Sequence, residues 1–419
     1  MVNRNFILGI DGIPFELMDS LSDKGIMPNF KELKRSYYFK EMKSSIPHIS
    51  SVSWSSIITG KNPGEHGIYG FSHLIPKTYS LSYPNFNALR CKAFWHQKSN
   101  EKHVIINVPA TYPAKRLNGV HIAGFVALDL DKAIYPKKYL PILKNLDYVI
   151  DIDSKLARKQ SKDILFDELL KVLDLRKKVY QIFWNKLVWN NFMVVITSSD
   201  RFGHFLWNTY KDSKNQWHSR SLQFFQKIDD FIGDIKNKLK EHDNFIILSD
   251  HGMEEIKLAM NLNTYLEQEG FLKISEKNKN YNRILKGTKA FVLDPGRVYI
   301  NKKGFFPNGS VSNQEEKDII EDLKKALYDL NYKKQKVIKT VYDKTEIYSG
   351  DYIDLAPDLV VLENSGFRPK GTIGKDEIFE KDIFPGMHND SAFLFINKDI
   401  DLKKPTVQDV VPLLEGDYE

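Results

Sequence analysis

The feature that most constrains the fold is a short apolar run that leads into an aspartate, a pattern that occurs three times. The three runs and their aspartates are Phe6–Ile10 with Asp11, Phe192–Thr197 with Asp200, and Asn244–Ser249 with Asp250. Short continuous apolar runs are typical of buried strands in a parallel sheet. Such sheets place functional groups at the carboxyl ends of their strands. We therefore expect the three aspartates to line one edge of a single sheet.

Helical patterns separate these strands along the chain. Apolar residues recur at three- and four-residue spacing over Ile164–Leu187, which predicts a long helix, and a second helix is expected over Gln216–Leu239. Strands that alternate with helices indicate an α/β fold: a doubly wound, mostly parallel central sheet flanked by helices.

The composition of the sequence changes between Glu254 and Phe384, where Lys and Asn become more frequent. A hairpin is predicted there over Ala290–Ile300. The character of a core strand returns at Ser391–Ile396. We therefore expect a catalytic core built from residues 1–253 and 385–419, with residues 254–384 inserted as a cap that shapes a substrate pocket.

Composition excludes several classes of protein. The only cysteine among 419 residues is Cys91, so neither an internal disulfide nor a thiolate metal cluster can form. No leader-like apolar segment precedes Phe6 and no apolar run reaches membrane length, which predicts a soluble cytoplasmic protein without a membrane partner. The net charge of +7 is spread over lysine-rich helix faces, so binding to nucleic acid is not required.

A serine-rich stretch runs from Pro47 to Gly60. Ser50 or Ser51 can cap a helix over residues 52–59. At a helix N-terminus, unpaired backbone N–H groups and the helix dipole favour an anion, which suits a nucleophile that attacks phosphorus. Taken alone, the stretch fits an ordinary serine-rich cap and loop better.

Six acidic and imidazole side chains are candidate metal ligands: Asp11, Asp200, His204, Asp250, His251 and His388. If a helix begins near Arg201, Asp200 and His204 lie four residues apart on one face. Carboxylates and neutral imidazoles suit Zn²⁺, with Mn²⁺ as a substitute. Each residue alone could be a helix cap or a loop residue. Together with a serine at a helix N-terminus, they contain the parts of a site in which two divalent ions clamp the attacking and leaving oxygens of a phosphoryl transfer.

Motifs along nearly the whole chain resemble those of the alkaline phosphatase superfamily, in its type I phosphodiesterase/nucleotide pyrophosphatase branch. The motifs that carry the resemblance are Gly9-Ile10-Asp11-Gly12, Pro47-x-x-Ser50 through Thr59-Gly60, Asn62-Pro63-x-x-His66-Gly67, Trp95, Asn107 to Pro113, Ser199-Asp200-x-x-x-His204, Ser249-Asp250-His251-Gly252, Asn263-x-x-Leu266, Asn301-x-x-Gly304-x-x-Pro307, Tyr348 to Gly350, Ala356-Pro357-Asp358 and Gly386-x-His388. The resemblance implies an alkaline phosphatase-like core.

The resemblance also implies roles for particular residues. One metal would be held by Asp200, His204 and His388, and the other by Asp11, Asp250 and His251 with the Ser50 hydroxyl. Ser50, ten residues before Gly60, would be the nucleophile and would form a phosphoserine. The backbone N–H of Ser51 would bind the substrate, which is expected to be a small-molecule phosphate ester, monoester or diester, or a nucleotide.

The sequence departs from the branch at two positions. Ser50 stands where many members have Thr, and both hydroxyls can attack phosphorus. By spacing, Phe71 stands where nucleotide pyrophosphatases have an Asn that donates to a phosphate oxygen. Because Phe71 cannot donate a hydrogen bond, pyrophosphatase activity is less expected. We expect Phe71 to make a different contact with the substrate. Two alternatives stay open: a phosphotransferase or nucleotidyl transferase that uses an alcohol as acceptor, and a non-catalytic protein that binds a phosphorylated metabolite. The complete set of ligands counts against the second.

Overall fold

The computed structural model describes residues 4–153, 157–275 and 280–416. These residues form two compact units. The first contains the described residues of 1–62, 85–254 and 388–419, and the second contains those of 63–84 and 255–387. The assignment of a catalytic core and a substrate cap to parts of the chain stays a prediction.

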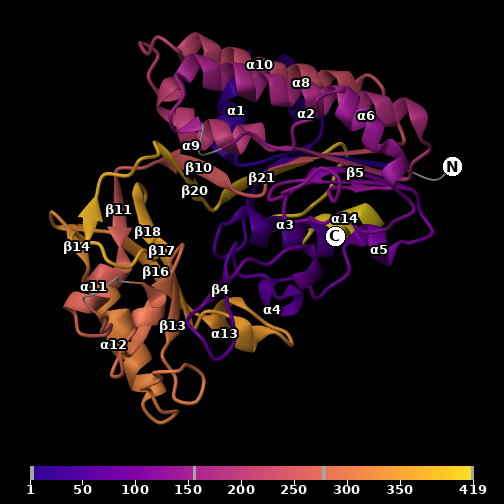
Figure 1. Ribbon diagram of the computed structural model, residues 1–419. Coiled ribbons are helices and arrows are strands. Elements are labelled where there is room, and N and C mark those ends of the chain that lie inside the picture. The colour runs from indigo at the N-terminus through magenta and orange to yellow at the C-terminus, as the bar shows by residue number, and fades with distance from the viewer. Residues whose placement is uncertain (1–3, 154–156, 276–279, 417–419) are drawn as a thin grey trace. The chain divides into compact units, whose positions relative to one another are not determined.

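The first unit is built on an eight-stranded sheet (Figure 1). The strands in spatial order are β2 (Tyr38–Lys43), β21 (Ser391–Ile396), β9 (Asn244–Leu248), β1 (Asn5–Ile10), β8 (Asn191–Ile196), β5 (His103–Val108), β6 (Gly119–Ala123) and β7 (Ile134–Tyr135). The neighbours from β9 to β6 pair in parallel, whereas β21, β2 and β7 pair antiparallel at the two edges. This confirms the mostly parallel central sheet predicted from the sequence.

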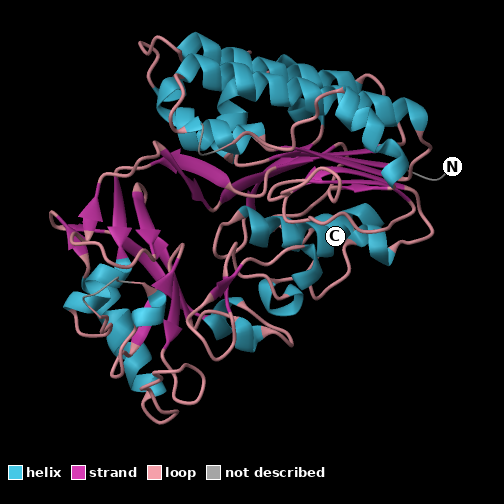
Figure 2. Ribbon diagram, in the orientation of Figure 1, coloured by secondary structure: helices cyan, strands magenta, loops and turns pink. Residues whose placement is uncertain are grey.

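Helices cover both faces of this sheet (Figure 2). On one face lie α1 (Phe15–Asp23), α2 (Pro28–Ser36), α6 (Leu140–Asn145), α8 (Lys162–Lys186) and α10 (His218–Lys236), and on the other lie α3 (Ser50–Thr59), α5 (Phe94–Gln97) and α14 (Val410–Glu415). The alternation of side chains along β1 divides the core accordingly. Phe6 and Leu8 pack into the cluster of the first helix layer, whereas Ile7 packs with Trp54 and the second layer.

The second unit contains two smaller sheets and its own apolar core. The four-stranded sheet has the order β12 (Ala290–Leu293), β13 (Arg297–Ile300), β17 (Leu359–Glu363) and β16 (Ile338–Asp343). The predicted hairpin around Asp294 is confirmed, because β12 and β13 pair antiparallel on either side of it. The three-stranded sheet has the order β18 (Phe367–Lys370), β11 (Leu258–Asn261) and β19 (Phe379–Glu380).

Short elements complete the second unit. Its helices are α4 (Pro63–His66), α11 (Leu262–Gln268), α12 (Glu316–Asp329) and α13 (Lys344–Ile347), and its hairpins pair β3 (His73–Leu74) with β4 (Leu81–Ser82) and β14 (Asn331–Tyr332) with β15 (Gln335–Lys336). At the two points where the chain passes between the residue ranges of the units, β10 (Gly252–Glu255) pairs with β20 (Gly386–Asn389), the strand that carries His388.

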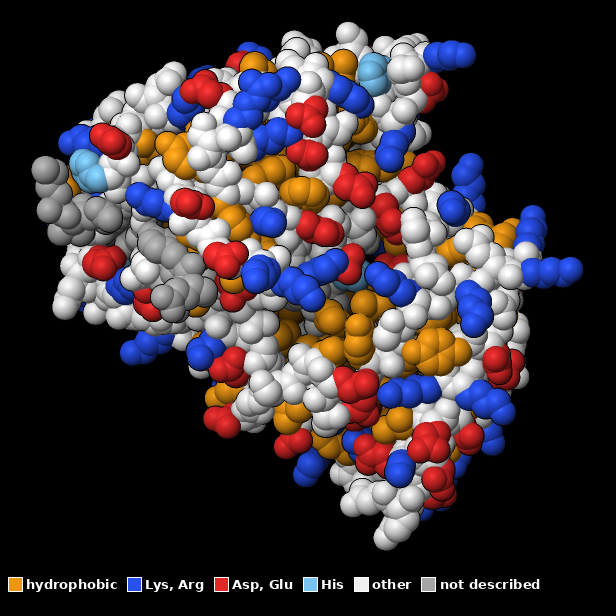
Figure 3. Space-filling model, turned by 180° about the vertical axis from the view of Figure 1, so that it is seen from behind, with side chains coloured by type: hydrophobic (Ala, Val, Ile, Leu, Met, Phe, Trp, Pro, Cys, Tyr) orange, Lys and Arg blue, Asp and Glu red, His pale blue; other side chains and the backbone are white. Residues whose placement is uncertain are grey.

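Charged side chains of both signs are interspersed over the face drawn in Figure 3, so lysines and arginines do not form one block there. Within the described residues, no helix combines the length and the apolar character needed to cross a membrane.

Candidate active site

The three aspartates meet because their strands are neighbours. In the parallel arrangement β9-β1-β8, Gly9 of β1 stands opposite Leu248 on one side and Val195 on the other, so all three strands end at the same edge. Asp11 follows β1 directly, Asp250 lies two residues beyond β9, and Asp200 lies in the first turn of α9 (Ser198–Lys211). Each of these side chains is buried.

Three histidines complete the cluster. His388 Nε2 lies 3.1 Å from Asp200 Oδ1 and 2.9 Å from His204 Nε2. His204 Nε2 is 3.4 Å from the same Asp200 oxygen, one helical turn along α9. His251 Nε2 lies 3.3 Å from Asp250 Oδ2 and 3.6 Å from Asp11 Oδ1. The structure thus brings together all six candidate ligands that the sequence singled out.

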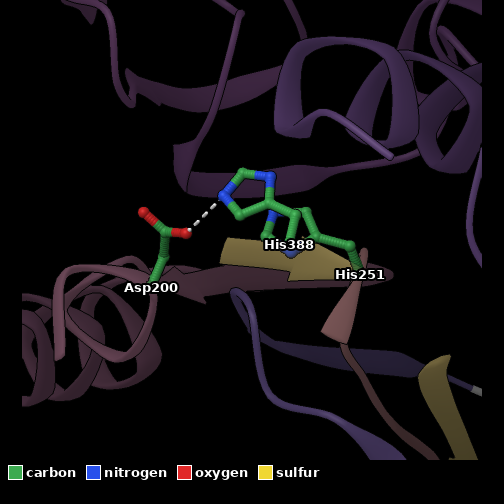
Figure 4. A group of neighbouring side chains, drawn as sticks. All are labelled: Asp200, His251 and His388. Carbon is green, nitrogen blue, oxygen red and sulfur yellow. Dashed lines mark hydrogen bonds and ion pairs between the residues drawn. The ribbon is translucent and has the colours of Figure 1, made fainter. Parts of the chain in front are cut away.

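The ligand atoms fall into two overlapping groups that could each hold a metal ion. One contains Asp11, Asp250 and His251, and the other contains Asp200, His388 and again His251 (Figure 4). His251 belongs to both groups because its ring stacks on that of His388, with centroids 3.7 Å apart. His204 lies at short distances from two residues of the second group, Asp200 and His388.

Hydrogen bonds set the tautomers of two of these histidines. His388 Nδ1 donates to the His48 carbonyl at 3.0 Å, and His251 Nδ1 donates to the Gly252 carbonyl at 3.0 Å. A proton on Nδ1 leaves Nε2 of the neutral ring with a lone pair, the form that ligates metals. In both residues this nitrogen is the one that faces the carboxylates.

In Asp11 and Asp250, likewise, one carboxylate oxygen accepts a hydrogen bond and the other does not. Asp11 Oδ2 accepts from Trp54 Nε1 at 3.2 Å, and Asp250 Oδ1 accepts from the Gly12 backbone N–H at 3.2 Å. The opposite oxygens, Asp11 Oδ1 and Asp250 Oδ2, are buried without a hydrogen-bond partner among the described residues. Buried oxygen and nitrogen lone pairs that face one another at such distances repel unless a proton or a metal cation lies between them. This arrangement fits divalent metal ions.

The three carboxylates of the cluster differ in the direction in which their surroundings shift the pKa. Burial, reinforced by the neighbouring carboxylates, raises the pKa of Asp11 well above its usual value. Burial and the charge of Asp200 raise the pKa of Asp250 to about 7. Burial would also raise the pKa of Asp200, but His204, His388 and Arg201 outweigh it and hold that pKa well below its usual value. The ionised forms of Asp11 and Asp250 are therefore the ones that a bound cation would stabilise most.

Gly12 lets β1 pass close to this cluster. Its φ is +71°, and a Cβ at this position would lie 3.1 Å from the Asp200 backbone. Only glycine adopts this conformation readily while leaving that space open. The turn aims the Gly12 N–H at Asp250.

Ser50 lies at the first position of α3, with its Oγ 3.0 Å from His251 Nε2. Because Nδ1 of His251 carries the proton, the Ser50 hydroxyl donates this hydrogen bond. The prediction that Ser50 or Ser51 caps the helix is wrong: the N-cap residue is Ile49, which has no side-chain cap, and the helix starts two residues earlier than expected. Ile49 can take this place because its carbonyl accepts the N–H groups of Val52 and Ser53 at 2.9 Å each.

The Ser51 side chain is buried, and its Oγ has no hydrogen-bond partner among the described residues. Its backbone N–H, at the second position of the helix, also has none within the described chain. An N–H at this position is one of the helix donors that have no intrahelical acceptor. Phe71 belongs to the second unit, so its contact with substrate stays a prediction.

Two residues of the cluster's surroundings were not identified from the sequence as supports of the ligands. Trp54 is fully buried and donates to Asp11, and Arg201 donates to Asp200 Oδ2 at 2.9 Å. Arg201 stands next to Asp200 in the chain, which is a signal that could have been used. Nothing in the local pattern around Trp54 indicates its contact with Asp11.

The sequence matches the family of type I phosphodiesterases/nucleotide pyrophosphatases over residues 5–389. The protein belongs to this family. Membership supports the hydrolysis of phosphoric esters, and members of the family are metalloenzymes, in agreement with the cluster of Asp and His ligands. No curated protein matches the sequence significantly.

The solved structures that are similar to this family member include those of two kinds of protein. Phosphonoacetate hydrolase from Sinorhizobium meliloti 1021 in complex with phosphonoacetate has a TM-score of 0.65 at 12% identity, covering 100% of this chain and 96% of that chain. Murine ectonucleotide pyrophosphatase/phosphodiesterase 5, as an inactive variant in complex with AMP, has a TM-score of 0.58 at 14% identity, covering 99% of this chain and 95% of that chain. These similarities establish the alkaline phosphatase-like fold.

Proposed function

We propose that this family member is a two-metal phosphoric ester hydrolase in which Ser50 forms a covalent phosphoserine intermediate. The observation that carries the proposal is the convergence of six ligands around one serine at a helix start. Ser50 Oγ lies 3.0 Å from Nε2 of His251, the residue shared by the two groups that could hold a metal.

The ligand sets proposed for the two ions are Asp200, His204 and His388 for one, and Asp11, Asp250, His251 and the Ser50 hydroxyl for the other. When bound, two divalent ions, Zn²⁺ or alternatively Mn²⁺, would lower the pKa of the hydroxyl and stabilise charge on the leaving oxygen.

The chain itself supplies the nucleophile and an anion site. Ser50 Oγ forms a bond to phosphorus as the bond to the leaving oxygen breaks, and the leaving alcohol takes up the proton lost from the serine. Water then cleaves the phosphoserine and restores the hydroxyl. The unpaired N–H of Ser51 and the N-terminus of α3 stabilise the negative phosphoryl oxygens through both steps.

The proposed substrate is a small-molecule phosphate ester, and a panel of leaving groups tests the proposal. Metal-stripped protein would be assayed with p-nitrophenyl phosphate, bis-p-nitrophenyl phosphate, AMP and phosphonoacetate, before and after addition of Zn²⁺ or Mn²⁺. The last two compounds are included because the similar structures hold them. We expect turnover of the phosphate esters only after metal is restored; phosphonoacetate has a carbon–phosphorus bond and no ester bond, so its turnover would indicate a different reaction.

Two ligand variants serve as controls. Asp200→Ala and Asp250→Ala should abolish turnover while the far-ultraviolet circular dichroism stays that of the wild type, because ligands at strand ends serve function more than packing. Metal-independent turnover, or full activity in either variant, would contradict the proposed mechanism.

A further inference from the structure

Arg201 makes an unusual contact for its position in a helix. It follows Asp200 in the first turn of α9, and adjacent residues of a helix point in different directions. Nevertheless, Arg201 Nη1 reaches back to donate to Asp200 Oδ2 at 2.9 Å. Something outside the helix must therefore hold the guanidinium in this place.

The holding groups come from a distant segment of the first unit. Arg201 Nε and Nη2 both donate to Asp151 Oδ2, at 2.9 and 2.6 Å, and the guanidinium carbon lies 4.3 Å from the centre of the Phe125 ring. Asp151 is fixed in turn, because its Oδ1 accepts the backbone N–H of Ile152 at 2.9 Å. Both carboxylates and the guanidinium are largely buried, with side chains 6 to 12% exposed.

This chain of contacts determines which Asp200 oxygen is available. Arg201 occupies Oδ2, whereas Oδ1 is the oxygen that faces His388 Nε2 at 3.1 Å and His204 Nε2 at 3.4 Å. The guanidinium is rigid and planar, so its hydrogen bonds to Asp151 fix the direction of the N–H group that it donates to Asp200. That hydrogen bond in turn fixes the orientation of the Asp200 carboxylate. The carboxylate can then offer one oxygen, in one orientation, to the histidines.

We propose that Arg201, anchored by Asp151, is a positioning residue that orients Asp200 and thereby sets the affinity of the metal ion held by Asp200, His204 and His388. The inference rests on the proposed two-metal function. A purely structural ion pair would stabilise the fold without affecting one metal site more than the other.

The test removes Arg201 together with its anchor Asp151, so that Asp151 is not left as a buried charge without a partner. Loss of Arg201 alone would leave the Asp151 carboxylate buried without its cationic partner. Arg201→Met combined with Asp151→Asn instead leaves two neutral side chains of similar size at these positions. Metal-stripped protein would be titrated with Co²⁺ and followed by its visible absorption and by calorimetry. For the double variant we expect one site to weaken by about 10- to 100-fold while the other keeps its wild-type affinity.

Two further variants separate orientation from charge and from general damage. Arg201→Lys keeps the charge, but its single ammonium cannot bridge Asp151 and Asp200 as the fork does, so we expect the same site to weaken by a smaller factor. Arg220→Met removes another arginine of this unit that pairs with carboxylates, Asp163 and Asp167, and should leave both affinities unchanged. Asp151→Asn alone serves if the double variant does not fold, and it should weaken the same site.

The outcomes distinguish the inference from the function on which it rests. Wild-type affinity at both sites in the double variant, or full rescue by Arg201→Lys, would overturn the positioning role, as would equal weakening of both sites. Failure of the wild-type protein to bind two Co²⁺ ions would instead contradict the proposed function.

Discussion

At the scale of single residues, the site depends on which atom of each side chain is already engaged. Asp11 and Asp250 each have one oxygen held by an N–H donor and one buried oxygen with no partner in the described chain. Ser50 and Ser51 differ in the same way, because Ser50 Oγ contacts His251 whereas Ser51 Oγ has no described partner. Neighbours in sequence are therefore expected to respond differently to substitution.

Ser50→Ala should lower the turnover number at least about a thousandfold, or about 4 kcal/mol of activation free energy, since it removes the proposed nucleophile. Ser51→Ala keeps the backbone N–H and should keep turnover. It should also raise the free energy of unfolding by about 0.5–1 kcal/mol, because it removes a buried hydroxyl without a partner and favours the helix.

Steady-state kinetics and urea unfolding of the two variants check this prediction. Peptide mass spectrometry of enzyme quenched at low pH during turnover should find the phosphoryl group on Ser50. A phosphoryl group on Ser51, or undiminished turnover in Ser50→Ala, would show that the nucleophile is assigned to the wrong serine.

Trp54→Phe removes the N–H that holds Asp11 Oδ2 but keeps an aromatic ring in the core. We expect the metal site of Asp11, Asp250 and His251 to lose affinity by about tenfold, as is usual when the partner of a ligand is removed. Trp95→Phe is a matched control, because Trp95 is buried in the same apolar cluster and its Nε1 has no hydrogen-bond partner among the described residues. Calorimetric titration with Zn²⁺ should find equal affinity in Trp95→Phe and the wild type; equal losses in both variants would contradict the role of Trp54.

At the scale of elements, the site requires β1 and α3 to approach closely. Gly9 of β1 lies under the Trp54 ring of α3, and a Cβ at Gly9 would come within 2.4 Å of Trp54 Cη2 and 3.0 Å of Val195 Cγ2. The ring has little room to give way, because it is fully buried and hydrogen-bonded to Asp11. The small residue at position 9 thus sets the distance between strand and helix.

Gly9→Ala should lower the free energy of unfolding by about 1–3 kcal/mol, the usual cost of overpacking a core, and should weaken metal binding by displacing Trp54. Urea unfolding and Zn²⁺ titration check both effects. Gly25→Ala is a control for glycine replacement, since open space surrounds Gly25 and only its φ of +75° opposes the change. That variant should lose stability without losing metal affinity; unchanged stability in Gly9→Ala would contradict the close packing.

At the scale of the whole molecule, pH couples stability to metal binding. The raised pKa of Asp250, about 7, means that the metal-free folded protein holds a proton that the unfolded chain releases near its usual value of 3.8. The stability contributed by this proton is fully present below that value and is lost as pH rises through about 7. A bound metal acts in the opposite direction, because its ligands must be deprotonated.

The increase in melting temperature caused by Zn²⁺ or Mn²⁺ should therefore be larger at pH 8 than at pH 5. His388 adds little to this difference, because burial and its neighbour His251 lower its pKa to about 3 and keep it neutral at both values. Differential scanning fluorimetry of metal-stripped and reconstituted protein measures the difference. A metal-induced shift that is equal at the two pH values, or larger at pH 5, would contradict the protonation of Asp250 in the metal-free state.

Much of the fold could be predicted from the sequence, because strands and helices are encoded by patterns within a few residues. The apolar runs before Asp11, Asp200 and Asp250 indicated buried strands, and the structure has β1, β8 and β9 at these places within one residue at each end. The spacing of Asp200 and His204 predicted a shared helix face, and both lie on α9. The six candidate ligands were predicted because Asp11, Asp200 and Asp250 follow the apolar runs and all six match family motifs.

Only the tertiary structure decided how these ligands are held. Trp54 reaches Asp11 across 43 positions in sequence, and Arg201 meets Asp151 across 50, so neither contact leaves a local pattern. The start of α3 depends on the Ile49 carbonyl and not on a serine side chain, so residue type alone mispredicted it. The sequence by itself determined which groups arrive at the sheet edge, because strand formation is local. The order of the strands and the packing of their helices decided which atom of each group faces the others.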